Sequence, residues 1–444
     1  MKNTRLALPA AMLMLGLSAP GHAFDLVGAW QAARNYNADF AVSRAQRDAG
    51  QEKLVQGRSQ LLPQISATGN YTYNNPLQPS QAVDAYGNVV TNSAYQTHGY
   101  NLNLQQPLFD VGKYTGYKKG KLGTELADTT FDAAEQQLIL DISQAYFDVL
   151  RAQDTLAATR ASKKTYQNLL LQAKTAFEVG TATITDTNEA QAGYDGAVAQ
   201  EISDANNLEL AQHNLQRLTG LDPAGIQTVR EQLPLEAPKP AGLDAWVDMA
   251  LQNSLKIKSA RQNLDLAHQT VIEKKGNHLP TVTLNTGYAD TVSNQFGGYP
   301  HTRGSNIGVT VNVPLFSGGG ISSQVREAVA QEEAAREQLE SSRRQVREDV
   351  RKAFLGVTNG AALVRAQQQL LVSAKSKVES TRLGKEVGIR TSIDLLQAEQ
   401  AYYSTLTTLA NAKYSYLTAR LSLAQSAGQL EPQVLGDVNQ LIAR

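Results

Sequence analysis

Two short segments carry the side chains whose spacing could do chemistry. FEVGTATITD at 177–186 and KEVGIRTSID at 385–394 each hold a glycine and then a threonine three residues before an aspartate. This spacing predicts a turn with a left-handed glycine, followed by a capping box that opens a helix. If three copies of the second segment met around one axis, Asp394 would also form a ring of carboxylates that attracts cations and pairs with the nearby Arg390. Capping and cation attraction can occur together.

No constellation supports catalysis or a metal site. The chain has no cysteine, and its six histidines include no HExxH pair. Disulfides, thiolate metal sites and thiol nucleophiles are therefore ruled out. The glycine-rich SGGGISSQV at 317–325 lacks the spacings of phosphate-binding loops, so we interpret it as a strand-to-helix transition. We therefore predict that the chain is not an enzyme, that it has no catalytic residue, and that it binds no cofactor and no metal.

Composition and the N-terminal segment narrow the class of protein. Lys+Arg and Asp+Glu both number 41, so the net charge is zero and no nucleic-acid partner is expected. After the first 20 residues no run of 18 apolar residues occurs, which excludes a helical-bundle transporter. Lys2 and Arg5 precede an apolar stretch, and small residues follow it. We therefore predict a signal peptide at 1–23 and a mature chain that starts near Phe24, outside the cytoplasm.

The elements that carry the two segments occur twice along the chain. QPLFDVG at 106–112 matches VPLFSGG at 313–319, and the glycine turns described above follow in the same order. The proline-rich residues 219–242 lie between the copies and cannot form continuous helix. We predict a tandem structural duplication. Its parts are a first repeat at 24–218, a linker at 219–242, a second repeat at 243–428 and a tail at 429–444.

Each repeat is predicted to contain a helix, two strands, a very long helix, a tight turn and a return helix. The strands, such as QISATGNYTY, alternate apolar residues with uncharged Asn and Thr. Transmembrane barrel strands show this alternation, although a half-buried soluble sheet shows it too. The predicted strands are 64–75, 98–109, 281–291 and 305–316, the long helices are about 117–178 and 321–386, and the return helices are 184–218 and 392–428.

Closure of the sheet requires more than one chain. Four strands cannot close a barrel, and lipid does not tolerate an open sheet edge. Twelve strands from a trimer leave room for a lumen, whereas side chains fill a barrel of eight. Heptad spacing in the long helices indicates coiled-coil pairing, which a solid bundle or a fibrous coiled coil would satisfy equally well.

The quoted segments resemble the TolC-like outer-membrane channel-tunnels, a family of outer membrane efflux proteins of Gram-negative bacteria. LLPQISATGNYTY, the repeated PLF, AYFDVL and the two glycine turns carry the resemblance, over roughly residues 24–430. It implies an α+β membrane protein: a homotrimeric 12-stranded antiparallel β-barrel in the outer membrane, continued through the periplasm by a 12-helix α-barrel with coiled-coil ends.

The resemblance also implies a function and partners. The trimer would be the exit duct of a tripartite efflux or type I secretion system, passing small molecules or proteins through a gated tunnel. Its partners would be outer-membrane lipid, a periplasmic adaptor (membrane fusion) protein and an inner-membrane RND or ABC transporter. A porin open at rest and a trimeric coiled-coil surface protein are the alternatives. The sequence leaves the cargo open.

The resemblance, carried over position by position, also assigns candidate site residues. Asp394 resembles the aspartate of an aperture ring, and Arg390 with Thr185 and Asp186 resembles the polar network that holds the tip shut. The turn tips that adaptors grip would be Val179, Gly180, Val387 and Gly388.

Two further aperture positions depart from the family's pattern. Gln397 stands where close relatives have a second aspartate, and Lys385 stands where they have a gate tyrosine. A single acidic ring with a lysine nearby predicts weaker selection for cations.

Overall fold

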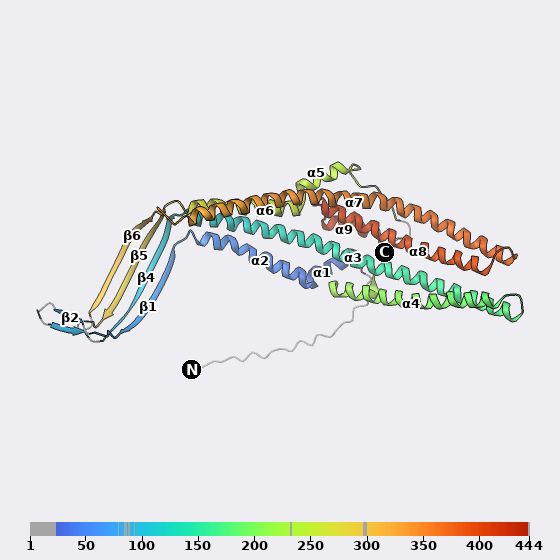
Figure 1. Ribbon diagram of the computed structural model, residues 1–444, viewed down its shortest axis with the longest axis horizontal. Helices are drawn as coiled ribbons and strands as arrows, with labels where there is room; N and C mark the ends of the chain where they lie inside the picture. Colours follow the sequence, from blue (N-terminus) through green and yellow to red (C-terminus); the bar gives the residue numbers. More distant parts are fainter. Residues whose placement is uncertain are drawn as a thin grey trace, which may run out of the picture.

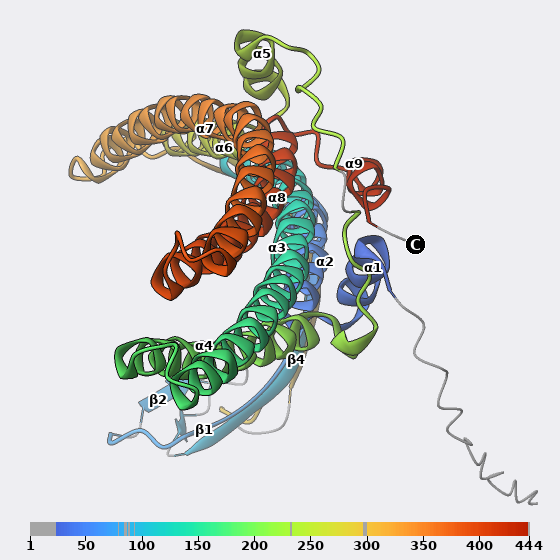
Figure 2. The same ribbon diagram turned by 90° about the vertical axis from the view of Figure 1, so that its right-hand side faces the viewer.

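The structure is a computed structural model that describes residues 24–78, 80–83, 87, 89–92, 94–230, 233–295 and 300–442. The predicted signal peptide at 1–23 lies outside the described residues. A curved sheet at one end leads into long helices that run to the other end (Figure 1). Viewed along their length, the helices form an open arc (Figure 2). In the described part of the chain, no helix has both the length and the apolar character needed to cross a membrane.

The first half of the chain contains two short helices, two long strands, a small hairpin and two long helices. Their bounds are α1 (Leu26–Tyr36), α2 (Ala38–Ser59), β1 (Gln64–Asn74), β2 (Ser80–Val83), β3 (Val89–Asn92), β4 (Tyr95–Phe109), α3 (Val111–Glu178) and α4 (Ile184–Thr219). The β2–β3 hairpin lies in a segment without a predicted strand.

The second half repeats this order without the small hairpin. Its elements are η1 (Pro223–Gly225), α5 (Leu243–Asn253), α6 (Leu255–Gly276), β5 (Thr281–Ser293), β6 (His301–Asn312), α7 (Gly320–Glu386), α8 (Ser392–Ser426) and α9 (Pro432–Asn439). The predicted tail at 429–444 thus contains a helix.

Four predicted boundaries were wrong. The single helix predicted at the start of the second repeat is two helices, α5 and α6, with Ser254 between them. The single helix predicted at the start of the first repeat is two helices, because the Asn37 side chain accepts a hydrogen bond from the Phe40 amide (2.9 Å) and starts a new helix. The strand predicted at 305–316 ends at Asn312, before a proline. The helix predicted from about 117 begins at Val111. Gly318 and Gly319, with φ of 60° and 82°, make the transition into α7, as the glycine-rich segment predicted.

One antiparallel sheet has the strand order β1-β4-β5-β6. Ile65, Leu104, Thr286 and Ile307 lie in one row across it. At the two edge strands of this row the apolar side chains are exposed, with Ile65 73% and Ile307 77% accessible. β1 and β6 are the edges, so each has a row of backbone groups that no described strand of the same chain pairs.

The helices form a curved layer whose edges follow those of the sheet. Near the sheet, α2 packs on α3, α3 on α6 and α6 on α7. Towards the far end, α4 packs on α3, α3 on α8 and α8 on α7. The order is therefore α2-α3-α6-α7 in one half and α4-α3-α8-α7 in the other. α2 and α4 lie at one edge, and α7 lies at the other (Figure 2).

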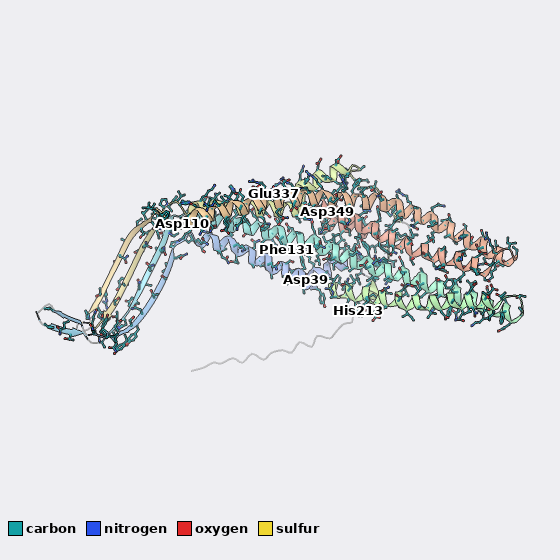
Figure 3. The ribbon with its side chains drawn as sticks, in the orientation of Figure 1. Asp39, Asp110, Phe131, His213, Glu337 and Asp349 are labelled. Carbon is teal, nitrogen blue, oxygen red and sulfur yellow. The ribbon has the colours of Figure 1, made fainter. Side chains whose placement is uncertain are left out.

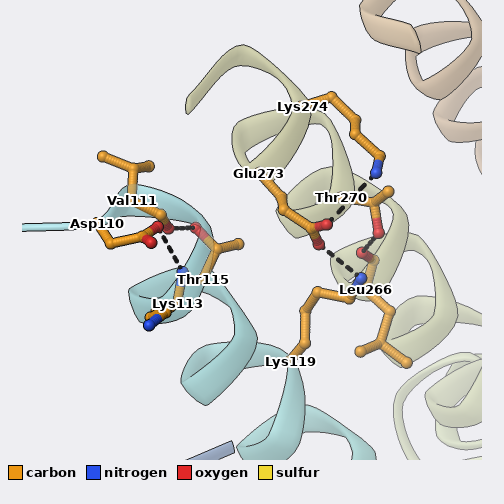
Figure 4. A network of polar contacts seen from close by, with 9 residues as sticks. All are labelled: Asp110, Val111, Lys113, Thr115, Lys119, Leu266, Thr270, Glu273 and Lys274. Atoms are coloured by element: carbon orange, nitrogen blue, oxygen red, sulfur yellow. Dashed lines mark hydrogen bonds and ion pairs between the residues drawn. The ribbon is translucent and has the colours of Figure 1, made fainter. Parts of the chain in front are cut away.

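Polar contacts fix the junction between sheet and helices. Asp110 lies there and caps α3, because its side chain accepts a hydrogen bond from the Lys113 amide at 3.0 Å (Figures 3 and 4). Lys119 on α3 pairs with Glu273 on α6 at 2.9 Å (Figure 4). Burial alone would raise the pKa of Glu273, but the hydrogen bond and charge of Lys119 hold this pKa below its ordinary value.

A belt of short elements, made of α1, α5, α9 and residues 220–230 and 233–242, lies on the convex side of the helices (Figures 1 and 2). Tyr146 of α3 is fully buried beneath it and donates to the Gln227 carbonyl at 2.7 Å. Tyr416 of α8 is also fully buried and donates to the Glu236 carbonyl at 3.1 Å. The linker is thus held by one buried tyrosine from each half of the chain.

Candidate functional site at the helical tips

The two glycine turns lie together at the end of the molecule farthest from the sheet (Figure 1). One joins α3 to α4 and the other joins α7 to α8. Gly180 and Gly388 have φ of 78° and 79°, which side chains with a Cβ rarely adopt. In the first turn the Thr181 amide donates to the Ala176 carbonyl at 2.8 Å, and the second turn closes by the equivalent bond.

Both turns lead into a complete capping box. The Asp186 amide donates to Thr183 Oγ1 at 3.2 Å, and the Thr183 amide donates to Asp186 Oδ2 at 2.9 Å. Thr391 and Asp394 form the same pair of bonds, at 3.1 and 2.9 Å. Because these bonds favour the charged carboxylate, the pKa of each aspartate lies below its ordinary value. Their stabilising effect is therefore complete above the ordinary aspartate pKa and is lost as the pH falls below it.

The predicted gate residues are not all in contact within one chain. Arg390 is exposed, and within the described residues it forms no hydrogen bond or ion pair with Thr185 or Asp186. Its charge contributes to the lowered pKa of Asp394, so these two groups lie near each other. Gln397 is exposed on α8, three residues beyond Asp394. Arg390 is thus available to a partner outside this chain.

Lys385 lies between the two helical hairpins, which are α3–α4 and α7–α8. It lines a small cavity with Asp186 and Glu189 of α4 and with Ser392 and Leu396 of α8. Its charge contributes to the lowered pKa of Asp186. Glu189 Oε2 is buried and has no hydrogen-bond partner in the described part of the chain. Sequence reasoning did not select Glu189, whose only local signal is its position three residues after Asp186.

Further from the tips, polar contacts join the hairpins directly. The Tyr414 hydroxyl of α8 donates to Asp154 of α3 at 2.7 Å. Nearer the tips, the Thr165 and Tyr403 hydroxyls lie 2.8 Å apart. Burial raises the pKa of Tyr414, so its hydroxyl remains a donor at any physiological pH. These bonds fix helix α3 of one hairpin against helix α8 of the other.

The positions predicted for adaptor contact are at the extreme end of the helices. Val179 and Val387 are 68% and 71% exposed, and each directly precedes the glycine of its turn. Exposed valines beside a rigid turn offer apolar area at little entropic cost. No group of metal-binding side chains was found among the residues that the structure describes.

Comparison with known proteins identifies the family. The sequence profile of the outer membrane efflux protein family matches residues 29–221 and 246–429. The chain belongs to this family. It is an outer-membrane protein that serves as an exit duct in efflux and type I secretion, and the family is one of channels rather than enzymes.

Individual relatives agree with this assignment. The chain is 32% identical to the outer membrane protein TolC of Salmonella enteritidis, over 97% of this chain and 88% of the relative. It is also 32% identical to the alkaline protease secretion protein AprF of Pseudomonas aeruginosa, over 95% of this chain and 88% of the relative. The crystal structure of the outer membrane protein VceC from Vibrio cholerae has the same fold, with a TM-score of 0.77 at 18% identity, covering 91% of this chain and 97% of VceC.

Proposed function

We propose that three copies of this chain form one gated tunnel, with a 12-stranded β-barrel continued by a 12-helix α-barrel. The observation that carries the proposal is the alignment of edges. β1 with α2 and α4 forms one edge of the protomer, and β6 with α7 forms the other. Pairing β6 of one copy with β1 of the next removes every open strand edge from the lipid. Three curved protomers then close both barrels together.

The protomer arose, we propose, by tandem duplication. The family profile matches the chain in two separate segments. The order helix, helix, strand, strand, long helix, return helix recurs in each half, and both return helices open with a Thr-x-x-Asp capping box. Each repeated unit supplies two of the four strands that a protomer contributes to the β-barrel. It also supplies two of the four helices that the protomer contributes to each level of the α-barrel.

The tips form the gate in this proposal. Asp394 of each copy contributes one carboxylate to a ring around the axis. Arg390 reaches Thr185 and Asp186 of a neighbouring copy, since among the described residues of its own chain it bonds to neither of them. Lys385 holds the two hairpins of one copy together through Asp186 and the unpartnered Glu189 carboxylate. With Gln397 in place of a second acidic ring, the closed aperture selects cations weakly.

The tips are also the proposed docking point for partners. A periplasmic adaptor would grip the exposed turns at Val179, Gly180, Val387 and Gly388, and an RND or ABC transporter in the inner membrane would supply the energy. Relatives named for efflux and for protease secretion support both kinds of system.

Deletion of the gene in its own host tests this function. We expect a fluorescent efflux dye to accumulate, an extracellular protein to be lost from the medium, or both, depending on the cargo. Expression of the full chain should restore export, and a matched variant without residues 1–23 should not, because it would remain in the cytoplasm. If deletion changes neither dye accumulation nor the extracellular proteins, the assignment as an exit duct is wrong.

A further inference from the structure

Charge is distributed unequally between the two edges of the protomer in the half that carries the tips. Helix α4 holds six carboxylates and one arginine, for a net charge of −5. The second half of α7, residues 351–386, holds seven lysines and arginines and two glutamates, for a net charge of +5. The whole chain is neutral. The opposite charges therefore lie on the two edges that a second copy would bring together.

The half nearer the sheet shows no such polarity. Helix α2 has four basic and three acidic residues, a net charge of +1. The first half of α7, residues 320–350, has five arginines and seven acidic residues, a net charge of −2. The same two edges of the protomer continue through both halves of the helical layer. Only the half that carries the tips has strongly opposite charges on them.

Some of the charged side chains of α4 and α7 already form ion pairs within the chain. Glu201 of α4 pairs with Arg160 and with Lys163 of α3. Arg382 of α7 pairs with Glu399 of α8 at 3.1 Å. These pairs account for charges that face the chain's own helices.

Other charges on the same helices have no such cationic or anionic partner. Asp195 is exposed on α4 and accepts a hydrogen bond only from Gln191 of its own helix among the described residues. Lys375 is exposed on α7, and it forms no ion pair with a carboxylate in the described part of the chain. Lys377, two residues further along, points to another side of α7, and its charge adds to the hydrogen bonds from Thr391 that lower the pKa of Asp394 in its own chain.

These residues also lie at matching heights. Asp195 is eleven residues beyond Ile184, where α4 begins, and Lys375 is eleven residues before Glu386, where α7 ends. At 1.5 Å per residue, both lie roughly 17 Å from the tip end of their helices. Within one chain α3 and α8 separate these two helices at this level. Contact between them therefore requires a second copy.

We propose that α4 of one protomer packs antiparallel against α7 of the next through an electrostatic seam, in which Asp195 faces Lys375. The inference rests on the proposed trimer and assigns the interface that holds its tunnel end closed. Opposite charges along a shared edge favour self-association in one register. Since the seam is solvated at its rim, high salt should weaken it. Opening of the tips then requires this seam to separate or slide.

Carbodiimide cross-linking of the purified full-length protein at low salt tests the seam. The reagent joins a lysine amine to a contacting carboxylate as an amide, with loss of water and without a spacer. Protein assembled from a mixture of ¹⁴N and ¹⁵N chains should give mixed-isotope peptides that join Lys375 to Asp195. The 2.9 Å pair Lys119–Glu273 should give a peptide of one isotope only and serves as the internal control.

Charge reversal gives a second, functional readout. Lys375→Glu should abolish the mixed-isotope peptides and increase resting conductance, and adding Asp195→Lys should restore both. Arg344→Glu with Arg347→Glu, on the first half of α7, is the matched control and should change neither.

The outcomes separate the seam from the trimer. A protein of trimeric mass that gives the Lys119–Glu273 peptide but no α4–α7 peptide would overturn the seam while leaving the proposed function standing. A protein that is not a trimer would overturn both.

Discussion

Replacing Arg390 by alanine should open the resting tunnel. In the proposed gate Arg390 donates charge-assisted hydrogen bonds to Thr185 and Asp186 of a neighbouring copy, and the substitution removes all three links of the trimer at once. Since about 1.4 kcal/mol corresponds to a tenfold change in an equilibrium, the loss of three such links should raise the open probability at least about tenfold. Single-channel recording in a planar bilayer measures this change directly.

A pair of variants separates the gate role of Asp186 from its capping role. Asp186→Ala removes both the proposed partner of Arg390 and the capping box, and it should open the tunnel as Arg390→Ala does. Thr183→Ala breaks the capping box but keeps the carboxylate, so it should leave conductance near that of the unmodified protein. If neither Arg390→Ala nor Asp186→Ala changes conductance, the gate assignment is wrong.

Tyr146→Ala should cost about 3 to 5 kcal/mol of unfolding free energy, the range for deletion of a buried aromatic side chain. Tyr146 is 0% exposed, and its hydroxyl donates to the backbone carbonyl of Gln227 in the linker. Burial raises its pKa, so the hydroxyl is a permanent donor. Denaturant titration of the protein in detergent, followed by circular dichroism, gives the free energy.

Two comparisons make the belt prediction specific. Tyr146→Phe keeps the ring but leaves the Gln227 carbonyl without its donor, so it should cost about 1 to 3 kcal/mol. Tyr114→Ala removes a tyrosine that is 52% exposed and should cost less than about 1 kcal/mol. Equal losses for Tyr146→Ala and Tyr114→Ala would show that the belt does not depend on this buried contact.

The features that could be predicted from sequence are those with a local or periodic signal. Strict alternation identified the four main strands, and the absence of proline identified the two long helices. The Thr-x-x-Asp spacing identified both capping boxes, because a capping box is made of neighbouring residues. The glycine turns followed from the left-handed conformation that glycine alone adopts readily.

The features that could not be predicted depend on contacts between distant segments or on weak local signals. The break at Asn37 has no proline or glycine, and only the side-chain hydrogen bond to the Phe40 amide reveals it. Glu189 gains its significance from Lys385, which is 196 residues away in the sequence and lines the same cavity. The pairing of Tyr414 with Asp154 likewise joins α8 to α3 across 260 residues. Periodicity carries no information about such pairs.

Single-channel conductance of the purified, unmodified protein tests the central claim most directly. A gated trimeric duct predicts a small and steady conductance at rest, because the tips close the tunnel while the barrel stays open. A large conductance at rest would contradict the gate and indicate a porin. The absence of any conductance from a protein inserted in the bilayer would contradict the tunnel itself and indicate an anchored coiled-coil protein.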